Sequence, residues 1–141
     1  MHIDITEKEK QPGAVIGSRL KIGNESYFES LSEIVERYII PCNRLVREVT
    51  SHPKFSDAQT YEKLEQRLKE EKKEDPARIP YRFAILPNYP QYIVLGYVPK
   101  ERVVKEFIKV RPRGFYFHDE NHAPFQKLIN WFKENWRKEK Y

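Results

Sequence analysis

Residues 80–111 read PYRFAILPNYPQYIVLGYVPKERVVKEFIKVR, and this stretch decides the fold. It contains three runs of the length and apolar character typical of strands, over residues 80–86, 92–98 and 103–111. Pro87-Asn-Tyr-Pro90 has the composition of a turn between the first two. Strands joined by short connections pair antiparallel, so we expect an antiparallel sheet here.

A helix is predicted on each side of these strands. Residues 58–74 place Tyr61, Leu64 and Leu68 at helical spacing among mixed charges. After the third strand, residues 115–117 predict a short aromatic strand and residues 119–123 a loop. Pro124 suits the start of a last helix, whose apolar face would be Phe125, Leu128, Ile129, Phe132 and Trp136. One helix can cover each face of the sheet, which predicts an α+β fold.

The first fifty residues predict two short strands and one long helix. Residues 2–6 and 15–22 suit the strands. Residues 26–51 suit the helix, with Asn24 or Ser26 as its N-cap and a bend or break at Pro41. Its expected apolar stripe is Phe28, Leu31, Ile34, Val35 and Tyr38.

The composition and net charge favour a domain that does not span a membrane and that binds anionic partners. The net charge is +5, which suits phosphorylated peptides, nucleic acid or acidic tails without choosing among them. No apolar run approaches the roughly 20 residues that a bilayer span needs, and the N-terminus does not resemble a secretory signal. The single cysteine, Cys42, excludes an internal disulfide and suggests a reducing compartment.

Nothing in the sequence organises catalysis. There is no phosphate-binding glycine loop and no nucleophile elbow. His118 and His122 are four residues apart, but they flank a predicted loop and have no cysteine pair beside them, so we expect solvated histidines rather than a metal site. We therefore predict neither an enzyme nor a cofactor.

The strand over residues 103–111 lies in a basic segment. Residues 100–113 carry six positive side chains against two carboxylates, a local charge of +4. Because successive side chains of a strand point to opposite faces, Lys105, Lys109 and Arg111 should share one face with Phe107. Val104, Ile108 and Val110 should face the core. The charged face predicts either a phosphate-binding surface or a solubilising strand face, and charge alone does not decide between them.

Two other functions are compatible with these charges. Residues 100–113, with the basic end of the last helix, could bind nucleic acid. Few aromatic residues lie between the basic ones, which argues against a surface for stacking bases. Alternatively the chain is a structural interaction domain, in which the helix over residues 26–51 holds two domains as a rigid pair.

Several segments resemble the Src homology 2 (SH2) domain. Residues 26–38, SYFESLSEIVERY, resemble its second helix. Residues 60–64 and 80–86 resemble its first helix and its phosphate-binding strand, and residues 124–138 resemble the second helix again. In order and spacing, the chain resembles the tandem SH2 regions of a family of transcription elongation factors that also act as histone chaperones. The stretches that carry this are residues 2–5, 33–41, 79–83, 92–97 and 130–133.

The resemblance implies a division into two SH2-like units joined by a long linking helix. Residues 1–40 would be the C-terminal half of a truncated first domain, and residues 41–141 a complete second domain. The arginine that clamps phosphate in the family's first domain would lie before residue 1. His2 would remain from that pocket, unless it is simply a surface residue of its strand.

The resemblance also implies an unusual phosphate site in the second domain. The family's arginine would fall near Ala84, where none is present. Arg82 lies two residues earlier on the same strand face and could replace it, or could pack its stem over an aromatic ring. The family's second domain uses other basic residues, including a strand lysine at the position of Lys109. The predicted phosphate-binding residues are Lys109, Arg111, Lys105 and Arg82.

In that family the partner is the phosphorylated linker and C-terminal region of the largest subunit of RNA polymerase II. The resemblance therefore implies a non-catalytic phosphopeptide-binding module that acts in the nucleus. Histones or nucleic acid would be partners through the full-length protein, and no membrane is implied.

Overall fold

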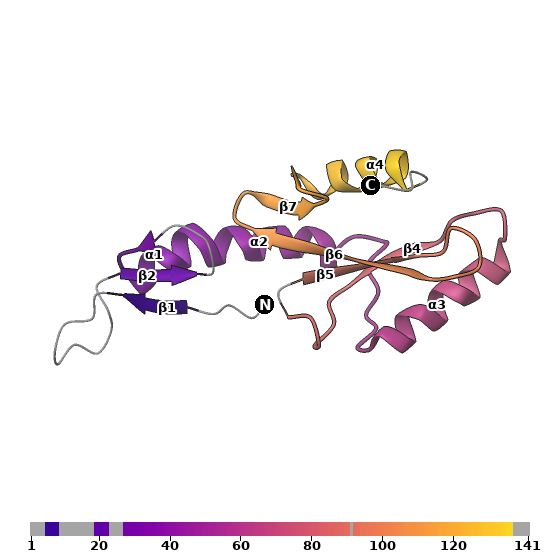
Figure 1. The fold of residues 1–141 in the computed structure, drawn as a ribbon, viewed down its shortest axis with the longest axis horizontal. Helices are drawn as coiled ribbons and strands as arrows, with labels where there is room; N and C mark the ends of the chain where they lie inside the picture. Colours follow the sequence, from indigo (N-terminus) through magenta and orange to yellow (C-terminus); the bar gives the residue numbers. More distant parts are fainter. Residues whose placement is uncertain (1–4, 9–18, 23–26, 91, 137–141) are drawn as a thin grey trace.

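The computed structural model describes residues 5–8, 19–22, 27–90 and 92–136. Two antiparallel sheets lie along one long helical run (Figure 1). The first sheet has the order β1-β2-β3, with β1 at Ile5–Lys8, β2 at Arg19–Ile22 and β3 at Tyr27–Phe28. His2, Asn24 and Ser26 lie outside the described residues.

The helical run begins later than its apolar spacing predicted. Tyr27 and Phe28 pair with β2 as a strand, and the helix starts with α1 at Leu31–Ile34. Ser30 is its N-cap, and its hydroxyl accepts a hydrogen bond from the backbone N–H of Glu33 at 3.1 Å.

Pro41 changes the backbone hydrogen-bonding pattern, but the helical run continues past it. A π-helical turn, η1 at Val35–Ile39, precedes α2 at Ile40–Thr50, and the N–H of Ile40 bonds the carbonyl of Val35. Proline lacks the N–H that would bond Arg37, and its ring crowds that carbonyl, so a wider turn relieves both problems.

The predicted apolar stripe is corrected on this helix. Ile34 and Tyr38 are buried as expected, and Phe28 is buried from its strand. Leu31 and Val35 instead remain 51% and 42% exposed.

The second sheet has the order β4-β5-β6-β7-β8, antiparallel throughout. Its strands are β4 (Tyr81–Ala84), β5 (Tyr92–Tyr97), β6 (Val104–Arg111), β7 (Gly114–Phe117) and β8 (Glu120–His122). The loop prediction for residues 119–123 is wrong at β8. His118 and Asp119 take φ angles of +50° and +62°, which folds the chain back onto β7.

The helices cover both faces of this sheet. On one face α3 (Tyr61–Glu74) packs Leu64 and Leu68 against Ala84 and Val94. On the other face α2 and α4 (Phe125–Asn135) enclose a larger core. These findings confirm the predicted α+β architecture, with helices flanking an antiparallel sheet.

One continuous core joins the two sheets through the long helix. It runs from Ile22 and Phe28, through Tyr38 and Cys42, to the second sheet. The helix is therefore packed into both parts rather than spanning a gap between them. Among the described residues, no helix is long and apolar enough to cross a membrane.

Candidate functional site: an open basic and aromatic sheet face

The α3 side of the second sheet is only partly covered. Leu64 and Leu68 of α3 sit over Gly96 of β5, where the absence of a Cβ allows the close approach. Further along the sheet Tyr92 and Phe107 are each 38% exposed. We call this uncovered region the open face; its residues are Tyr89, Tyr92, Lys105, Phe107, Lys109, Arg111 and Tyr116.

The two faces of β6 divide as its alternation predicted. Ile108 and Val110 are buried in the core on the α4 side. Lys105, Lys109 and Arg111 lie opposite them with Phe107, because antiparallel partners share a face and β5 places Val94 and Gly96 beside them toward α3. The structure thus brings three of the four predicted phosphate-binding residues onto one surface.

Lys105 is surrounded by aromatic rings. Its Nζ lies 4.3 Å from the ring centroid of Tyr61 and 5.3 Å from that of Tyr89. The ammonium also donates a hydrogen bond to the Tyr89 hydroxyl at 3.4 Å. Burial, followed by the nearby Glu65 carboxylate, raises the pKa of the Tyr61 hydroxyl, so that ring stays neutral beside the cation. The rings fix the position of this charge by cation–π attraction.

Lys109 stands between two aromatic residues across the strands. It is paired in register with Tyr92 on β5 and Tyr116 on β7. Arg111 lies nearby, with Cζ 4.4 Å from the Tyr116 ring centroid. In the described part of the chain, neither Lys105 nor Lys109 forms an ion pair with a carboxylate. The charge of both lysines is therefore available to an anionic ligand.

Arg82 is not part of this surface. Its Nε lies 3.1 Å from Oε1 of Glu71, a second guanidinium nitrogen contacts the same carboxylate, and Nη1 donates to the Pro53 carbonyl at 2.8 Å. Arg82 and Lys105 flank Gly96 in register, and Leu68 of α3 packs over that glycine. The side chain thus ties α3 and the α2–α3 connection to β4, on the far side of the helix from Lys105.

The position expected for an SH2 arginine belongs to the core. Ala84 is fully buried with Leu64, Leu68 and Val94. Apolar side chains fill the space beneath α3, and the basic side chains of β6 lie on the open face instead.

The two candidate metal-binding histidines point to different partners. His118 Nε2 lies 2.8 Å from Glu106 Oε1, and its ring stacks on Trp131 with centroids 5.4 Å apart. His122 is buried, with Nε2 3.9 Å from a Glu120 oxygen. Within the described ranges, no three histidine, cysteine or acidic side chains are placed to hold a metal ion.

Glu106 of β6 lies between His118 and Tyr97. Burial raises the pKa of its carboxyl group, and the hydrogen bond and charge of His118 oppose that shift. The Tyr97 hydroxyl donates to Glu106 at 3.1 Å. Tyr97, Glu106 and His118 thus form a polar cluster whose members hydrogen-bond to one another.

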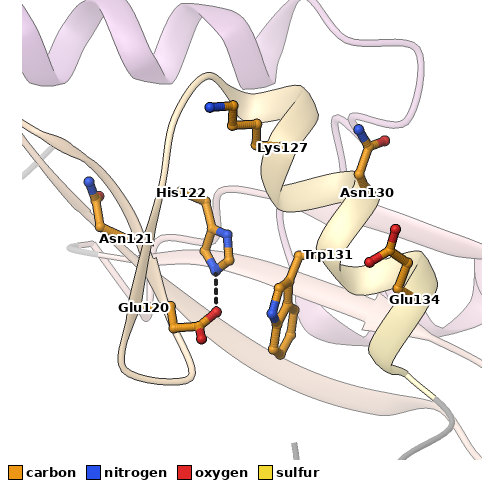
Figure 2. Close-up of a pocket in the computed structure, with 7 residues that line it drawn as sticks. All are labelled: Glu120, Asn121, His122, Lys127, Asn130, Trp131 and Glu134. Carbon is orange, nitrogen blue, oxygen red and sulfur yellow. Dashed lines mark ion pairs between the residues drawn. The ribbon is translucent and has the colours of Figure 1, made fainter.

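A pocket lies between β8 and α4 (Figure 2). Figure 2 shows the His122 ring directed toward Glu120, with Trp131 beside it. The lining residues are Glu120, Asn121, His122, Lys127, Asn130, Trp131 and Glu134. Its mixed charges, with two carboxylates, suit a phosphoryl group less well than the open face does.

The aromatic half of the open face is not predicted from the sequence. Tyr89, Tyr92 and Tyr116 belong to a loop and two strands that flank β6. Register between strands brings Tyr92 and Tyr116 beside the basic residues, and the connection between β4 and β5 brings Tyr89. The sequence signal that could have located Tyr92 was its two-residue spacing from Val94 and Gly96, which places all three side-chain positions on one face of the strand.

Comparison with known proteins identifies the class of this fold. The SH2 domain family profile matches residues 1–135. The chain belongs to the SH2 domain family, a class of binding module without catalytic machinery. This confirms the predicted family and the prediction of a non-catalytic role.

The similar proteins are transcription elongation factors. The chain is 34% identical over 141 residues to transcription elongation factor SPT6 of Drosophila melanogaster, covering 96% of this chain and 8% of that protein. It is 31% identical to an SPT6-like factor of Arabidopsis thaliana, covering 94% and 10%. The chain therefore spans about a tenth of the length of these relatives.

Two solved structures share the fold. One is a tandem SH2 domain of Spt6 that binds the phosphorylated RNA polymerase II C-terminal repeat domain; it has a TM-score of 0.80 and 24% identity, covering 94% of this chain and 68% of that one. The other is the tandem SH2 domains of Antonospora locustae Spt6, with a TM-score of 0.73, 18% identity and coverage of 94% and 67%. The predicted resemblance to tandem SH2 regions of elongation factors is confirmed.

Proposed function

We propose that this chain is a non-catalytic phosphopeptide-binding module of a nuclear transcription elongation factor. Its partner is the phosphorylated linker or C-terminal region of the largest subunit of RNA polymerase II. The proposal is supported by membership of the SH2 family and by the related tandem SH2 domain that binds the phosphorylated repeat domain.

The observation that carries the proposal is the arrangement of cations on the open face. Lys109 and Arg111 lie two residues apart on one side of β6, a separation of about 7 Å along the strand. Long cationic side chains at that spacing can reach one phosphoryl group between them. Charge-assisted hydrogen bonds to phosphoryl oxygens are roughly twice as strong as neutral ones. Lys105 extends the positive surface toward Tyr61 and Tyr89.

We also propose the division at residue 41. Residues 1–40 then form the C-terminal half of a first SH2-like domain, and residues 41–141 the complete second. The order β1-β2-β3 followed by α1 repeats the order β6-β7-β8 followed by α4, which supports two copies of one unit. The proposed boundary falls next to the start of α2, inside the continuous helical run.

A binding titration with matched peptides tests the proposed function. Polymerase linker peptides, unphosphorylated and carrying phosphoserine, phosphothreonine or phosphotyrosine, are titrated by fluorescence anisotropy. At least one phosphorylated form should bind more tightly, and Lys109→Gln should weaken it about tenfold, the loss of one hydrogen bond to a charged group. Lys73→Gln is the matched control, because it removes the same charge from an exposed position of α3. Equal affinity for phosphorylated and unphosphorylated peptides would reject the proposal.

A further inference from the structure

The open face carries a second kind of ligand chemistry, in its aromatic rings. Within residues 100–113 few aromatic residues lie among the basic ones, which in sequence disfavours nucleic acid. In the fold, however, Tyr89, Tyr92 and Tyr116 reach the same surface from neighbouring segments. The rings and the cations are therefore interleaved in space rather than in sequence.

The rings form a connected and accessible group. The Phe107 ring centroid lies 4.7 Å from that of Tyr89 and 5.7 Å from that of Tyr92. Phe107 and Tyr92 keep 38% of their surface exposed, whereas Phe83 and Phe115 in the core are fully buried. Neighbouring exposed rings on one surface indicate an interaction site rather than a packing requirement.

Cations and rings lie beside one another in two directions. Along β6 the order on this face is Lys105, Phe107, Lys109 and Arg111. Across the strands Lys109 lies between Tyr92 and Tyr116. Adjacent strands are about 5 Å apart and alternate residues about 7 Å apart, so a ring and a cation are always neighbours. An unpaired nucleic-acid strand presents the complementary pattern, with flat bases joined by phosphates.

We propose that the open face binds single-stranded RNA, with bases stacked on Phe107 and Tyr92 and phosphates held by Lys105 and Lys109. This function goes beyond phosphopeptide binding, which needs the cations but not the exposed rings. Double-stranded nucleic acid does not fit, because its base faces are hidden by stacking. The hydroxyls of Tyr89, Tyr92 and Tyr116 beside the stacking surfaces suit a ribose 2′-hydroxyl, which favours RNA over DNA.

The test is an anisotropy titration with labelled oligouridine and oligoadenine RNA of about ten nucleotides, a length within the range that such sites cover. The full chain should bind RNA with an affinity that falls as salt rises, since phosphate contacts release counterions. Phe107→Leu and Tyr92→Leu keep apolar volume but remove the ring. Each should weaken RNA binding at least fivefold, the lower end of the effect of losing one stacked base.

Controls separate this proposal from the phosphopeptide proposal. Leu31→Ala, at an exposed apolar position on α1, should leave RNA binding unchanged. Phe107→Leu should keep its thermal unfolding transition and its affinity for a phosphorylated linker peptide. Unlabelled phosphopeptide should compete with RNA, because both use Lys109. RNA binding in a chain that ignores phosphorylation would reject the phosphopeptide proposal alone.

Four results would overturn the RNA proposal. One is no RNA binding at low salt; another is RNA binding by both ring variants that is as tight as that of the parent chain. DNA of the same sequence, or a duplex, that binds as tightly as RNA would remove the ribose and stacking arguments. Equal loss of RNA and phosphopeptide binding in a folded Phe107→Leu variant would assign the ring to the shape of the whole site rather than to base stacking.

Discussion

Glu48 of α2 accepts a hydrogen bond from the backbone N–H of Phe125 at 3.2 Å, joining residues 77 positions apart. Phe125 is the first residue of α4, and the N-cap residue, Pro124, makes no side-chain hydrogen bond that caps the helix. The first N–H groups of a helix need partners, and a carboxylate there also complements the helix dipole. The linking helix α2 thus supplies, through Glu48, the capping group for α4, the last helix.

Replacing Glu48 should therefore destabilise the second sheet and not only the linking helix. Glu48→Ala removes an N-terminal cap, which typically costs about 1–2 kcal/mol of unfolding free energy. Urea denaturation followed by circular dichroism measures the change. Glu36→Ala removes the same charge from an exposed position of the same run and should change stability much less. Equal effects would mean that the contact with Phe125 contributes nothing.

Replacing Arg82 tests whether this residue stabilises the fold or binds the phosphopeptide. Its side chain is 13% exposed and that of its partner Glu71 is 25% exposed, so removing either leaves a partly buried charge without its partner. Arg82→Met should lower the unfolding free energy by about 1–3 kcal/mol, less than for a fully buried pair. Phosphopeptide affinity, measured under conditions where the variant is folded, should stay within twofold of the parent. A tenfold loss of affinity in a stable variant would return Arg82 to the phosphate site.

Gly114 marks a position that excludes a side chain. Its φ of +149° is one that other residues rarely adopt, and a Cβ there would lie 2.7 Å from the backbone oxygen of His122. Gly114→Ala should therefore push β7 and β8 apart, with a loss of about 2 kcal/mol or more. Gly96→Ala offers the comparison, because its Cβ would meet the flexible end of Leu68. Thermal melts of both variants should show the larger drop for Gly114→Ala.

Local pattern was sufficient to predict most of the elements and the two faces of β6. The turns, and the side chains that contact each other from distant parts of the chain, were harder to predict. β8 was missed because His118 and Asp119 adopt positive φ without the glycine that usually signals such a turn. The alternation that gave Arg82 the correct strand face could not reveal Glu71, which α3 brings from eleven residues earlier. The aromatic half of the open face depends on register between strands, which no single strand encodes.

Histidine 52 provides a pH-dependent test of the packing between α2, α4 and the sheet. Its ring lies edge-on to Phe125 with centroids 5.4 Å apart, and its Nδ1 accepts a hydrogen bond from the N–H of Lys54 at 3.0 Å. Burial, then the charges of Lys133 and Lys54, lowers the pKa of this imidazole below 6.5. Protonation therefore favours the unfolded chain. The contribution of His52 to stability is complete above about pH 6.5 and is lost as the pH falls through the folded pKa.

An NMR titration of the His52 ring protons should give a midpoint below 6.5, the ordinary histidine value. Lys133→Gln removes the second-largest cause of the shift and should move that midpoint upward. Lys127→Gln removes the same charge from another exposed position of α4, beside the β8 pocket, and should leave it in place. If both variants move the midpoint equally, general surface charge controls the titration. If neither moves it, burial against Phe125 and the Lys54 charge lower the pKa, and the Lys133 charge has no part in it.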